Sequence, residues 1–406
     1  MPTIQSSEPD KRVFMILDSV YPSRGGGGAE AQVGTLSRWL TEHGIPCTIV
    51  VPMVAWGPQV AHETEGRVEI VRLRYPRLPL LGGLILQARL MWFLLRRRHR
   101  IQALHAHIAN NMAASTSLIN RLLKKPLLVK LTGFTELNGG ILDKTPRRAV
   151  RLKRSLLKGA RIQAISHMLI TRLLDAGFER DRIHHIPNAV DTTRFNPDPE
   201  YRRRQRERTH PGIDMVAVYV GRLEAEKGVD LLIDTWMSTF SSEQPVKLIL
   251  VGSGSLQDTL EARVQRQQRQ HQIEFAGQST DVAAYLAAAD IGLLTSHAEG
   301  LSNTLLESMA AGLPMIGSRV SGNEDFIEPE VNGWLFPAGN AQALAECLRT
   351  AHGTGHRKLV EMGQIARIKV ESLASIPAVS ERLLALYADS SRTLHNNDSF
   401  TSAHGH

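Results

Sequence analysis

The sequence predicts an α/β protein with two doubly wound domains in tandem, each a parallel sheet covered by helices on both faces. Three observations predict this fold class. The chain has 406 residues, more than a single hydrophobic core usually serves. Short apolar segments alternate with helix-like segments, which is typical of parallel sheets. The alternation pauses once, in the polar, arginine-rich stretch 192–213, so we predict domains at residues 1–190 and 191–390.

The first domain begins with a strand–helix–strand unit. An apolar strand is expected at 13–20, a glycine loop at 25–28 and a helix at 29–43, in which Val33 and Leu40 share one face. Further strands of this domain are expected at 46–51, 68–73, 101–107, 126–133, 160–166 and 182–187.

The second domain repeats the alternation. Its strands are expected at 215–221, 246–252, 272–277, 290–296 and 314–318. Ligands of such sheets bind beyond the carboxyl ends of the strands, so two facing domains would form a binding cleft. The polar residues 391–406 are predicted to be a disordered tail.

Charge is divided unequally between the two domains. Residues 1–190 hold 28 Lys and Arg against 13 Asp and Glu, whereas residues 191–406 hold 20 against 27. We therefore expect an anionic partner for the first domain: a phospholipid surface, a pyrophosphate-bearing substrate or nucleic acid. Nucleic acid is the least favoured, because aromatic residues make up 5% of the chain and no DNA-reading motif is recognisable.

The sequence favours a reduced, cytoplasmic setting. The two cysteines, Cys47 and Cys347, lie in different domains, and residues 1–12 lack the apolar core of a signal peptide. An apolar segment at 78–100 is interrupted too often to span a bilayer. It could lie on anionic lipid as an amphipathic helix, or it could pack on the sheet as an ordinary helix.

One loop of the second domain carries two cations that suit a diphosphate. In the segment GRLEAEKG (221–228), Arg222 can bind phosphate with two bonds and Lys227 as a point charge. The alternative is a solvated loop in which these cations pair with Glu224 and Glu226.

Two glycine turns could bring backbone amides close to a phosphate. They contain Gly27 and Gly28 in the first domain and Gly252, in VGSGS (251–255), in the second. Neither turn fits G-x-G-x-x-G, and a purely structural turn explains each equally well.

Two histidines end a predicted strand of the first domain. His105 and His107 are two residues apart and therefore point to the same face. A metal pair lacks a third ligand, and no D-x-D offers carboxylates to Mg²⁺ or Mn²⁺, so we predict no metal site. A histidine that faces a substrate is favoured over the metal pair, and histidines that only pack remain an alternative.

Two glutamates flank the turn in HAEGLSNTLLES (297–308). Thr304 to Glu307 fits T-x-x-E, so a capping box could explain Glu307. Capping cannot explain Glu299, which lies in the loop.

The segment EGLSNTLLE resembles the E-x7-E signature of the retaining glycosyltransferases of family 4, which have the GT-B fold of two Rossmann-like domains facing a cleft. Eight further segments appear in that family's order, and the resemblance covers about residues 13–350. These segments are GGAE, HAH, AISHMLITRLLDAGF, IPNAVDTTRFNP, VGRLEAEKG, VGSGS, FAGQSTDVAAYLAAADIGLLTS and EVNGWLFPAG. The chain departs from the family at Ala189, where glycine is common, and at Asp325, where glutamate is common.

The resemblance implies a role for each candidate residue. Arg222 and Lys227 would bind the donor diphosphate and stabilise the leaving group. Glu307 would bind the ribose, and Glu299 the donor sugar. His107 would face the reacting sugar. Further phosphate contacts are implied for Gly27, Gly28, Gly252, Leu301, Ser302, Asn303 and Thr304.

The implied function is metal-independent, retaining transfer of a sugar without a cofactor. The expected donor is a nucleotide-sugar, in first place a UDP-sugar, and the acceptor is a hydroxyl of a polysaccharide, lipopolysaccharide or lipid-linked oligosaccharide. The protein would be cytoplasmic, either free or peripheral on the inner face of the membrane. The alternatives are a nucleotide-sugar epimerase or phosphorylase on the same fold, and a noncatalytic nucleotide-sugar or membrane-binding subunit.

Overall fold

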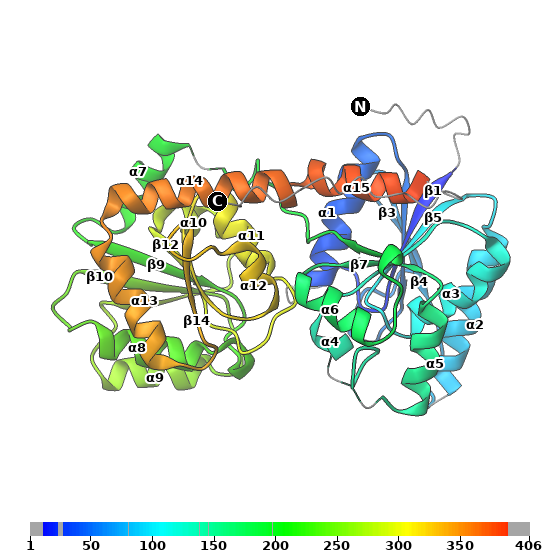
Figure 1. Ribbon diagram of the computed structural model, residues 1–406, viewed down its shortest axis with the longest axis horizontal. Coiled ribbons are helices and arrows are strands. Elements are labelled where there is room, and N and C mark those ends of the chain that lie inside the picture. Colours follow the sequence, from blue (N-terminus) through cyan, green and yellow to red (C-terminus); the bar gives the residue numbers. More distant parts are fainter. Residues whose placement is uncertain are drawn as a thin grey trace, which may run out of the picture.

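The computed structural model shows two lobes joined side by side (Figure 1). It describes residues 11–388, except 23–26, 80, 138, 145 and 197. The predicted disordered tail, 391–406, and two glycines of the first loop, Gly25 and Gly26, lie outside the described residues.

The first lobe contains an eight-stranded sheet in the order β3-β4-β2-β1-β5-β6-β7-β8. All neighbouring strands are parallel except β3 and β4. The strands are β1 (Arg12–Leu17), β2 (Cys47–Pro52), β3 (His62–Glu65), β4 (Val68–Leu73), β5 (Ile101–His107), β6 (Leu127–Lys130), β7 (Arg161–Ala164) and β8 (Ile183–His185). The helices are α1 (Gly28–Glu42), α2 (Leu81–Arg96), α3 (Asn111–Leu123), α4 (Phe134–Leu137), α5 (Arg148–Leu157) and α6 (His167–Asp175), with a 3-10 turn at Arg180–Arg182.

The second lobe contains a six-stranded, all-parallel sheet in the order β11-β10-β9-β12-β13-β14. The strands are β9 (Met215–Val220), β10 (Val246–Val251), β11 (Ile273–Gly277), β12 (Ile291–Leu294), β13 (Met315–Ser318) and β14 (Gly333–Phe336). The helices are α7 (Pro199–Thr209), α8 (Val229–Thr239), α9 (Gln257–Arg266), α10 (Val282–Ala288), α11 (Asn303–Ala310), α12 (Ser321–Phe326), α13 (Ala341–Gly353) and α14 (His356–Ala374), with a 3-10 turn at Ala225–Lys227. The helix that follows, α15 (Ile376–Ala388), belongs to the first lobe.

Continuous apolar strands are buried because helices cover both faces of each sheet. In β1, Val13 and Met15 pack into a core with α1 and α15, whereas Phe14 and Ile16 pack on the opposite face with α2 and α3. This alternation is the period of two expected of a strand between two helical layers. The predicted doubly wound α/β class is confirmed.

Two strands have no counterpart in the sequence prediction. β3, with the sequence HETE, is exposed along its whole length and pairs antiparallel with β4 at the sheet edge. β14 has only four residues, although it pairs in register with β13. The polar β3 lacks the apolar run on which the other predictions rested, whereas β14, with the sequence GWLF, has such a run and was left out of the prediction.

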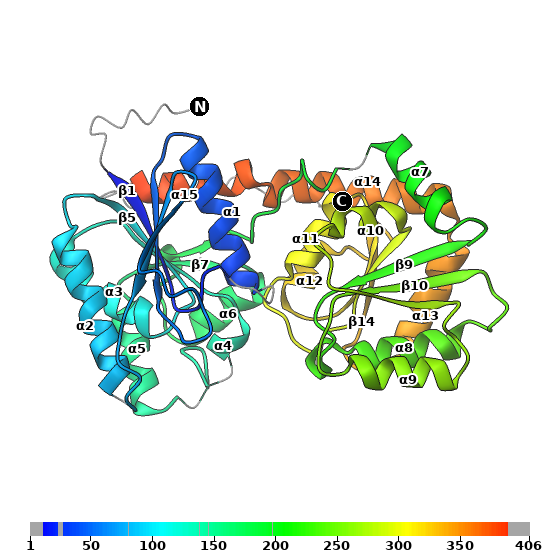
Figure 2. The same ribbon diagram turned by 180° about the vertical axis from the view of Figure 1, so that it is seen from behind.

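The last helix returns the chain to the first lobe (Figures 1 and 2). α14 lies on the second lobe, and α15 packs beside α1 on the first sheet. Val379 and Leu383 are buried in the core that contains Val13 and Leu36. The structure therefore differs from the predicted boundaries, because the apolar face of 376–388 completes the cover of the first sheet rather than the second.

No helix within the described residues is long and apolar enough to cross a membrane. In α2, Leu86, Leu90 and Leu94 pack on the first sheet, as in the ordinary packed helix that the sequence left open.

In both sheets the chain leaves a central strand in one direction and later returns to its other side. β1 lies between β2 and β5, and β9 lies between β10 and β12. Ligands of open α/β sheets bind beyond the carboxyl ends of the strands where this reversal occurs. The loops that follow β1, β5, β9 and β12 are therefore the first places to look for a site.

The carboxyl ends of the two sheets face each other across a close backbone contact. A Cβ added to Gly300, after β12, would lie 2.0 Å from the carbonyl oxygen of Thr132, after β6. The hydroxyls of Ser166 and Ser321 are 2.8 Å apart. These contacts join the strand ends of one domain to those of the other.

Candidate active site

The loops after β9 and β12 interlock at the reversal point of the second sheet. The Lys227 ammonium lies 2.5 Å from Oε1 of Glu299, which also accepts a hydrogen bond of 2.9 Å from the Ser296 hydroxyl. The Thr295 hydroxyl donates to the carbonyl of Lys227, and the backbone N–H of His297 donates to the carbonyl of Glu226. The structure thus brings two predicted residues, 72 positions apart, into one ion pair.

A glycine holds this loop arrangement in place. Gly228 has φ +62° and precedes α8 as its N-cap, and a Cβ there would lie 2.3 Å from the carbonyl oxygen of Thr295. Only glycine accepts both the left-handed backbone and the close approach. The position of Lys227 therefore depends on the glycine that follows it, Gly228.

Arg222 lies at the start of the same loop but is more exposed. Its guanidinium pairs with Glu226 at 2.5 Å, and 55% of its side chain is exposed. Glu224 instead accepts hydrogen bonds from the backbone and hydroxyl of Ser255, and these bonds lower the pKa of its carboxyl. The pairing expected of a solvated loop is therefore present for Arg222, which meets Glu226, whereas Lys227 pairs outside this loop with Glu299.

The VGSGS turn lies against the Arg222 loop. Gly252 has φ +139°, and a Cβ there would lie 1.9 Å from the carbonyl oxygen of Gly221. A similar clash, at 2.3 Å, would arise between Gly254 and the carbonyl oxygen of Leu223. Close packing of two backbones is thus sufficient to explain the glycine at Gly252.

Glu307 lies in the second turn of α11 and forms no capping box. The helix begins at Asn303 after the N-cap Ser302, so Thr304 is already inside it. The carboxylate of Glu307 accepts no hydrogen bond within the described part of the chain. Burial raises its pKa, and the charge of Arg194 opposes that rise. A partly buried carboxylate without a partner is available to bind a ligand hydroxyl.

The N-termini of α1 and α11 meet at Asn303. Its side-chain oxygen accepts hydrogen bonds from Gln32 and Asn188, and its amide nitrogen donates to the carbonyl of Gly28. Asn188 also donates to the carbonyl of Leu301, 3.0 Å away. Gly28 and the 301–304 segment, predicted as separate phosphate contacts, are therefore neighbours across the domain junction.

Gln32 and Asn188 are site residues that the sequence prediction missed. Gln32 also bonds both backbone groups of Ala189, at 2.7 Å each. Neither residue carries a charge, and both act through hydrogen bonds between segments far apart in sequence. The one available signal was the position of Asn188 next to a departure from the family pattern.

Gly27 precedes α1 as its N-cap, with an extended backbone. A Cβ at Gly27 would clash with the carboxylate of Glu30. Its absent side chain thus leaves room for Glu30 at the first turn of α1.

His107 ends β5, at the reversal point of the first sheet, and is fully buried. Its ring centroid lies 4.1 Å from that of His105, which confirms that the two share one face. Burial, together with His105 and Lys130, holds the pKa of His107 well below its usual range. No hydrogen bond or ion pair among the described residues joins His107 to Glu299 or Lys227.

The neighbour of His107 on β6 is a buried lysine. Lys130 pairs in register with His107, and burial lowers the pKa of its ammonium to about 7. When it is protonated, this lysine disfavours a metal ion on His105 and His107. On the opposite side, the Tyr387 hydroxyl lies 2.6 Å from Nδ1 of His105.

Two family models match the chain, one for each domain. The model described as Glycosyltransferase Family 4 matches residues 26–194, and the model described as Glycosyl transferases group 1 matches residues 214–352.

Curated relatives and solved structures give the same result. The amylovoran biosynthesis glycosyltransferase AmsK of Erwinia amylovora is 30% identical over 192 residues, 45% of this chain and 46% of AmsK. The alpha-D-kanosaminyltransferase of Streptomyces kanamyceticus is 23% identical over 354 residues, 79% of this chain and 87% of that protein. The chain spans about half the length of several curated relatives that it matches.

The crystal structure of Anabaena HepE in complex with UDP superposes with a TM-score of 0.74 at 19% identity, and the match covers 92% of this chain and 98% of HepE. The fold is therefore GT-B. The family models, the relatives and this fold agree: the first domain matches the family 4 glycosyltransferases, and the second matches the group 1 glycosyl transferases.

Proposed function

We propose that this protein is a retaining glycosyltransferase that moves a sugar from a UDP-sugar to a hydroxyl of a polysaccharide, lipopolysaccharide or lipid-linked oligosaccharide acceptor. The observation that carries the proposal is the Lys227–Glu299 pair at the reversal point between β9 and β12, opposite the strand ends of the first domain. HepE, which shares the fold, was crystallised in complex with UDP. Relatives named for colanic acid, amylovoran and teichuronic acid biosynthesis support a polysaccharide acceptor.

The donor diphosphate would lie between two basic side chains and a helix N-terminus. Lys227 has three N–H donors, so it can hold Glu299 and a phosphate oxygen together. Arg222 is exposed and can exchange Glu226 for a second phosphate oxygen. The first amides of α11 and its dipole add favourable contacts to negative charge. These groups would stabilise the negative charge that grows on the departing nucleotide, without requiring a metal.

Glu299 would bind hydroxyls of the donor sugar. Its carboxylate is already bonded to Lys227 and Ser296, so it is a weak nucleophile and a well-oriented hydrogen-bond acceptor. The sugar would leave through an oxocarbenium-like state, and the acceptor would attack from the same face. A covalent sugar trapped on Glu299 would contradict this assignment, because the two-step retaining scheme requires such an intermediate.

Glu307 would bind the ribose of the nucleotide. It follows the phosphate-facing end of α11 by about one turn, and its carboxylate is partly buried without a hydrogen-bond donor of its own. Two ribose hydroxyls would supply those donors, which offsets the cost of burying the charge.

The acceptor side would include a membrane surface. α3 packs between α2 and α5 on the outer face of the first domain, and these three helices contain no Asp or Glu. Their exposed large apolar residues are Leu81, Leu84, Trp92, Leu118, Leu122 and Leu152. Their exposed basic residues include Arg89, Arg96, Arg121, Arg148 and Arg151. Apolar and basic side chains together suit an anionic bilayer that displays a lipid-linked acceptor.

A thermal-shift panel with UDP, GDP, ADP and their sugar conjugates tests the donor. A ligand at 100 times its Kd should stabilise the protein by about 2.7 kcal/mol, and we expect UDP and a UDP-sugar to give the largest shift. Isomerisation of the donor without an acceptor would favour the epimerase alternative. Binding without any turnover would favour the noncatalytic subunit.

Lys227→Ala tests the site itself. We expect transfer to fall at least about 100-fold, as when a preorganised charge-stabilising donor is removed. Lys247→Ala is the matched control, because the Lys247 side chain is 16% exposed, close to the 20% of Lys227, and forms an ion pair with Glu274 on the neighbouring strand. Equal rates for wild type and Lys227→Ala would contradict the proposed diphosphate site.

A further inference from the structure

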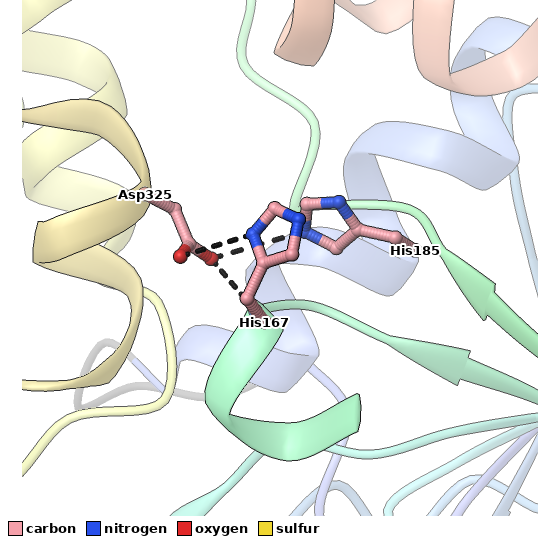
Figure 3. Close-up of side chains that lie close together, drawn as sticks. All are labelled: His167, His185 and Asp325. Carbon is pink, nitrogen blue, oxygen red and sulfur yellow. Dashed lines mark hydrogen bonds and ion pairs between the residues drawn. The ribbon is translucent and has the colours of Figure 1, made fainter. Parts of the chain in front are cut away.

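Two histidines of the first domain and one aspartate of the second converge at the domain junction (Figure 3). His167 is the first residue of α6, His185 ends β8, and Asp325 lies on α12. The ligand atoms of the three side chains lie within 4.8 Å of one another. None of the three belongs to the proposed donor site.

The distances suit a metal ion with nitrogen and oxygen ligands. His167 Nδ1 lies 3.1 Å from Oδ1 of Asp325, and His185 Nε2 lies 3.8 Å from Oδ2. A tetrahedral ion with bonds of about 2.0–2.2 Å separates its ligand atoms by about 3.3–3.6 Å. The observed distances bracket that range, and the two rings have centroids 4.2 Å apart.

An ordinary ion pair explains only part of this cluster. A protonated His167 would satisfy Asp325, but Nε2 of His185 is buried, points toward the same carboxylate and has no hydrogen-bond partner. The cluster therefore holds one more metal-ligating atom than a simple pair requires.

The carboxylate of Asp325 is already oriented by the first domain. Its Oδ2 accepts a hydrogen bond of 2.9 Å from the backbone N–H of His167, at the start of α6. The side chain of Asp325 is only 10% exposed, whereas that of His167 is 69% exposed and leaves a path from solvent. Hydrogen-bonded carboxylates of this kind are typical of metal sites.

We propose that His167, His185 and Asp325 bind one divalent transition-metal ion of the zinc class, which ties the two domains together. Two imidazoles and one carboxylate favour zinc and its neighbours over Mg²⁺ and Ca²⁺, which prefer oxygen ligands. The fourth position would remain open to water. This site is separate from the sugar-transfer chemistry, so it stands or falls independently of the proposed function.

The test is zinc binding to the full chain after metal is stripped. His395, His404 and His406 near the C-terminus are replaced by alanine in all proteins, so that these residues do not supply ligands. Zinc retained after desalting is counted by mass spectrometry, and affinity is measured by titration. We expect one zinc per chain, with at least about 10-fold weaker binding in His185→Ala and in Asp325→Asn.

Two variants keep the result interpretable. Asp325→Asn retains an oxygen for the backbone N–H of His167, so loss of zinc without a change in the metal-free melting temperature isolates ligation from folding. His356→Ala is the matched control, because His356 also approaches a buried aspartate, Asp290 at 3.6 Å, but has no second histidine in that pair. Its zinc affinity should equal that of the parent.

The tie between domains has its own readout in solution scattering. Zinc should narrow the distribution of the radius of gyration of the parent protein. It should leave that distribution unchanged in Asp325→Asn. Unchanged zinc affinity in both His185→Ala and Asp325→Asn would overturn the site. Zinc binding without any effect on the dimensions of the parent would overturn the tie.

Discussion

Lys227 and Glu299 act as one unit at the scale of single residues. Each side chain is mostly buried, at 20% and 14% exposed, and each is the charged partner of the other. Removing one leaves the other charge partly buried and unpaired, which costs more than the pair contributes. The Arg222–Glu226 pair is different, because both side chains are about half exposed and such pairs contribute little.

Glu307→Gln should make the protein more stable at neutral pH. Burial raises the pKa of this carboxyl above its ordinary value of 4.5, so the wild type loses stability as the pH rises through that raised pKa. Glutamine carries no charge to bury, so we expect a higher free energy of unfolding at pH 7. The gain should disappear at pH 3, well below the ordinary pKa of 4.5, where the carboxyl is protonated in both states.

Urea unfolding at pH 7 and pH 3 measures this difference directly. Glu261→Gln, on the exposed face of α9, should change neither value. Glu307→Gln should also bind UDP about 10-fold more weakly than the wild type if Glu307 holds the ribose. A stability difference that is equal at both pH values would show that the ionised carboxylate bears no burial cost.

At the scale of elements, the site is made by loops that the sequence could place only one at a time. The apolar strands before Arg222 and Glu299 predicted that both loops lie at the carboxyl ends of parallel strands, and the structure agrees. Which cation meets which carboxylate was not predictable, because that depends on β9 and β12 being neighbours. The spacing favoured Glu226 or Glu224 for Lys227, whereas the sheet order delivers Glu299.

The junction between domains was predicted least well. Gln32, Asn188 and Asn303 form it through uncharged hydrogen bonds, which leave no periodic pattern in a sequence. The return of α15 to the first sheet was missed for a similar reason. Its apolar face predicts a packed helix, but nothing local says which sheet it covers.

Gly300→Ala should separate the two domains without unfolding either one. Gly300 has no left-handed backbone requirement, so the cost is steric: the new Cβ would lie 2.0 Å from the carbonyl oxygen of Thr132 and 3.2 Å from Cδ1 of Ile165. The loops on either side would have to move apart, and we expect transfer to fall at least about 10-fold, because misplaced reacting groups slow an enzyme strongly. Steady-state rates and circular dichroism measure the two effects.

Gly83→Ala is the control for this variant, because a Cβ on that α2 glycine meets nothing within 4 Å. It should preserve activity. If Gly300→Ala kept the wild-type rate, closure at this contact would not be part of the reaction.

At the scale of the whole molecule, the uneven distribution of charge follows the division into two domains. The first domain carries the excess of Lys and Arg, and α2, α3 and α5 gather part of it on the face opposite α1 and α15. The acidic excess of the second domain does not oppose a nucleotide, because cations and helix amides line its reversal point. The basic outer face and the donor site would therefore serve two different anions.

Leu84→Asp should weaken binding to anionic vesicles if this face docks on a bilayer. Leu84 is 68% exposed on α2, so aspartate there costs little stability but adds charge repulsion and removes apolar contact with lipid. Sedimentation with phosphatidylglycerol vesicles at low salt measures the bound fraction, which should also fall as salt screens the basic residues. Ile368→Asp on α14, at an equally exposed apolar position of the second domain, should bind as the wild type does. Two results would contradict docking on a membrane and favour an acceptor in solution. One is equal vesicle binding by all three proteins, and the other is no preference for anionic over neutral vesicles.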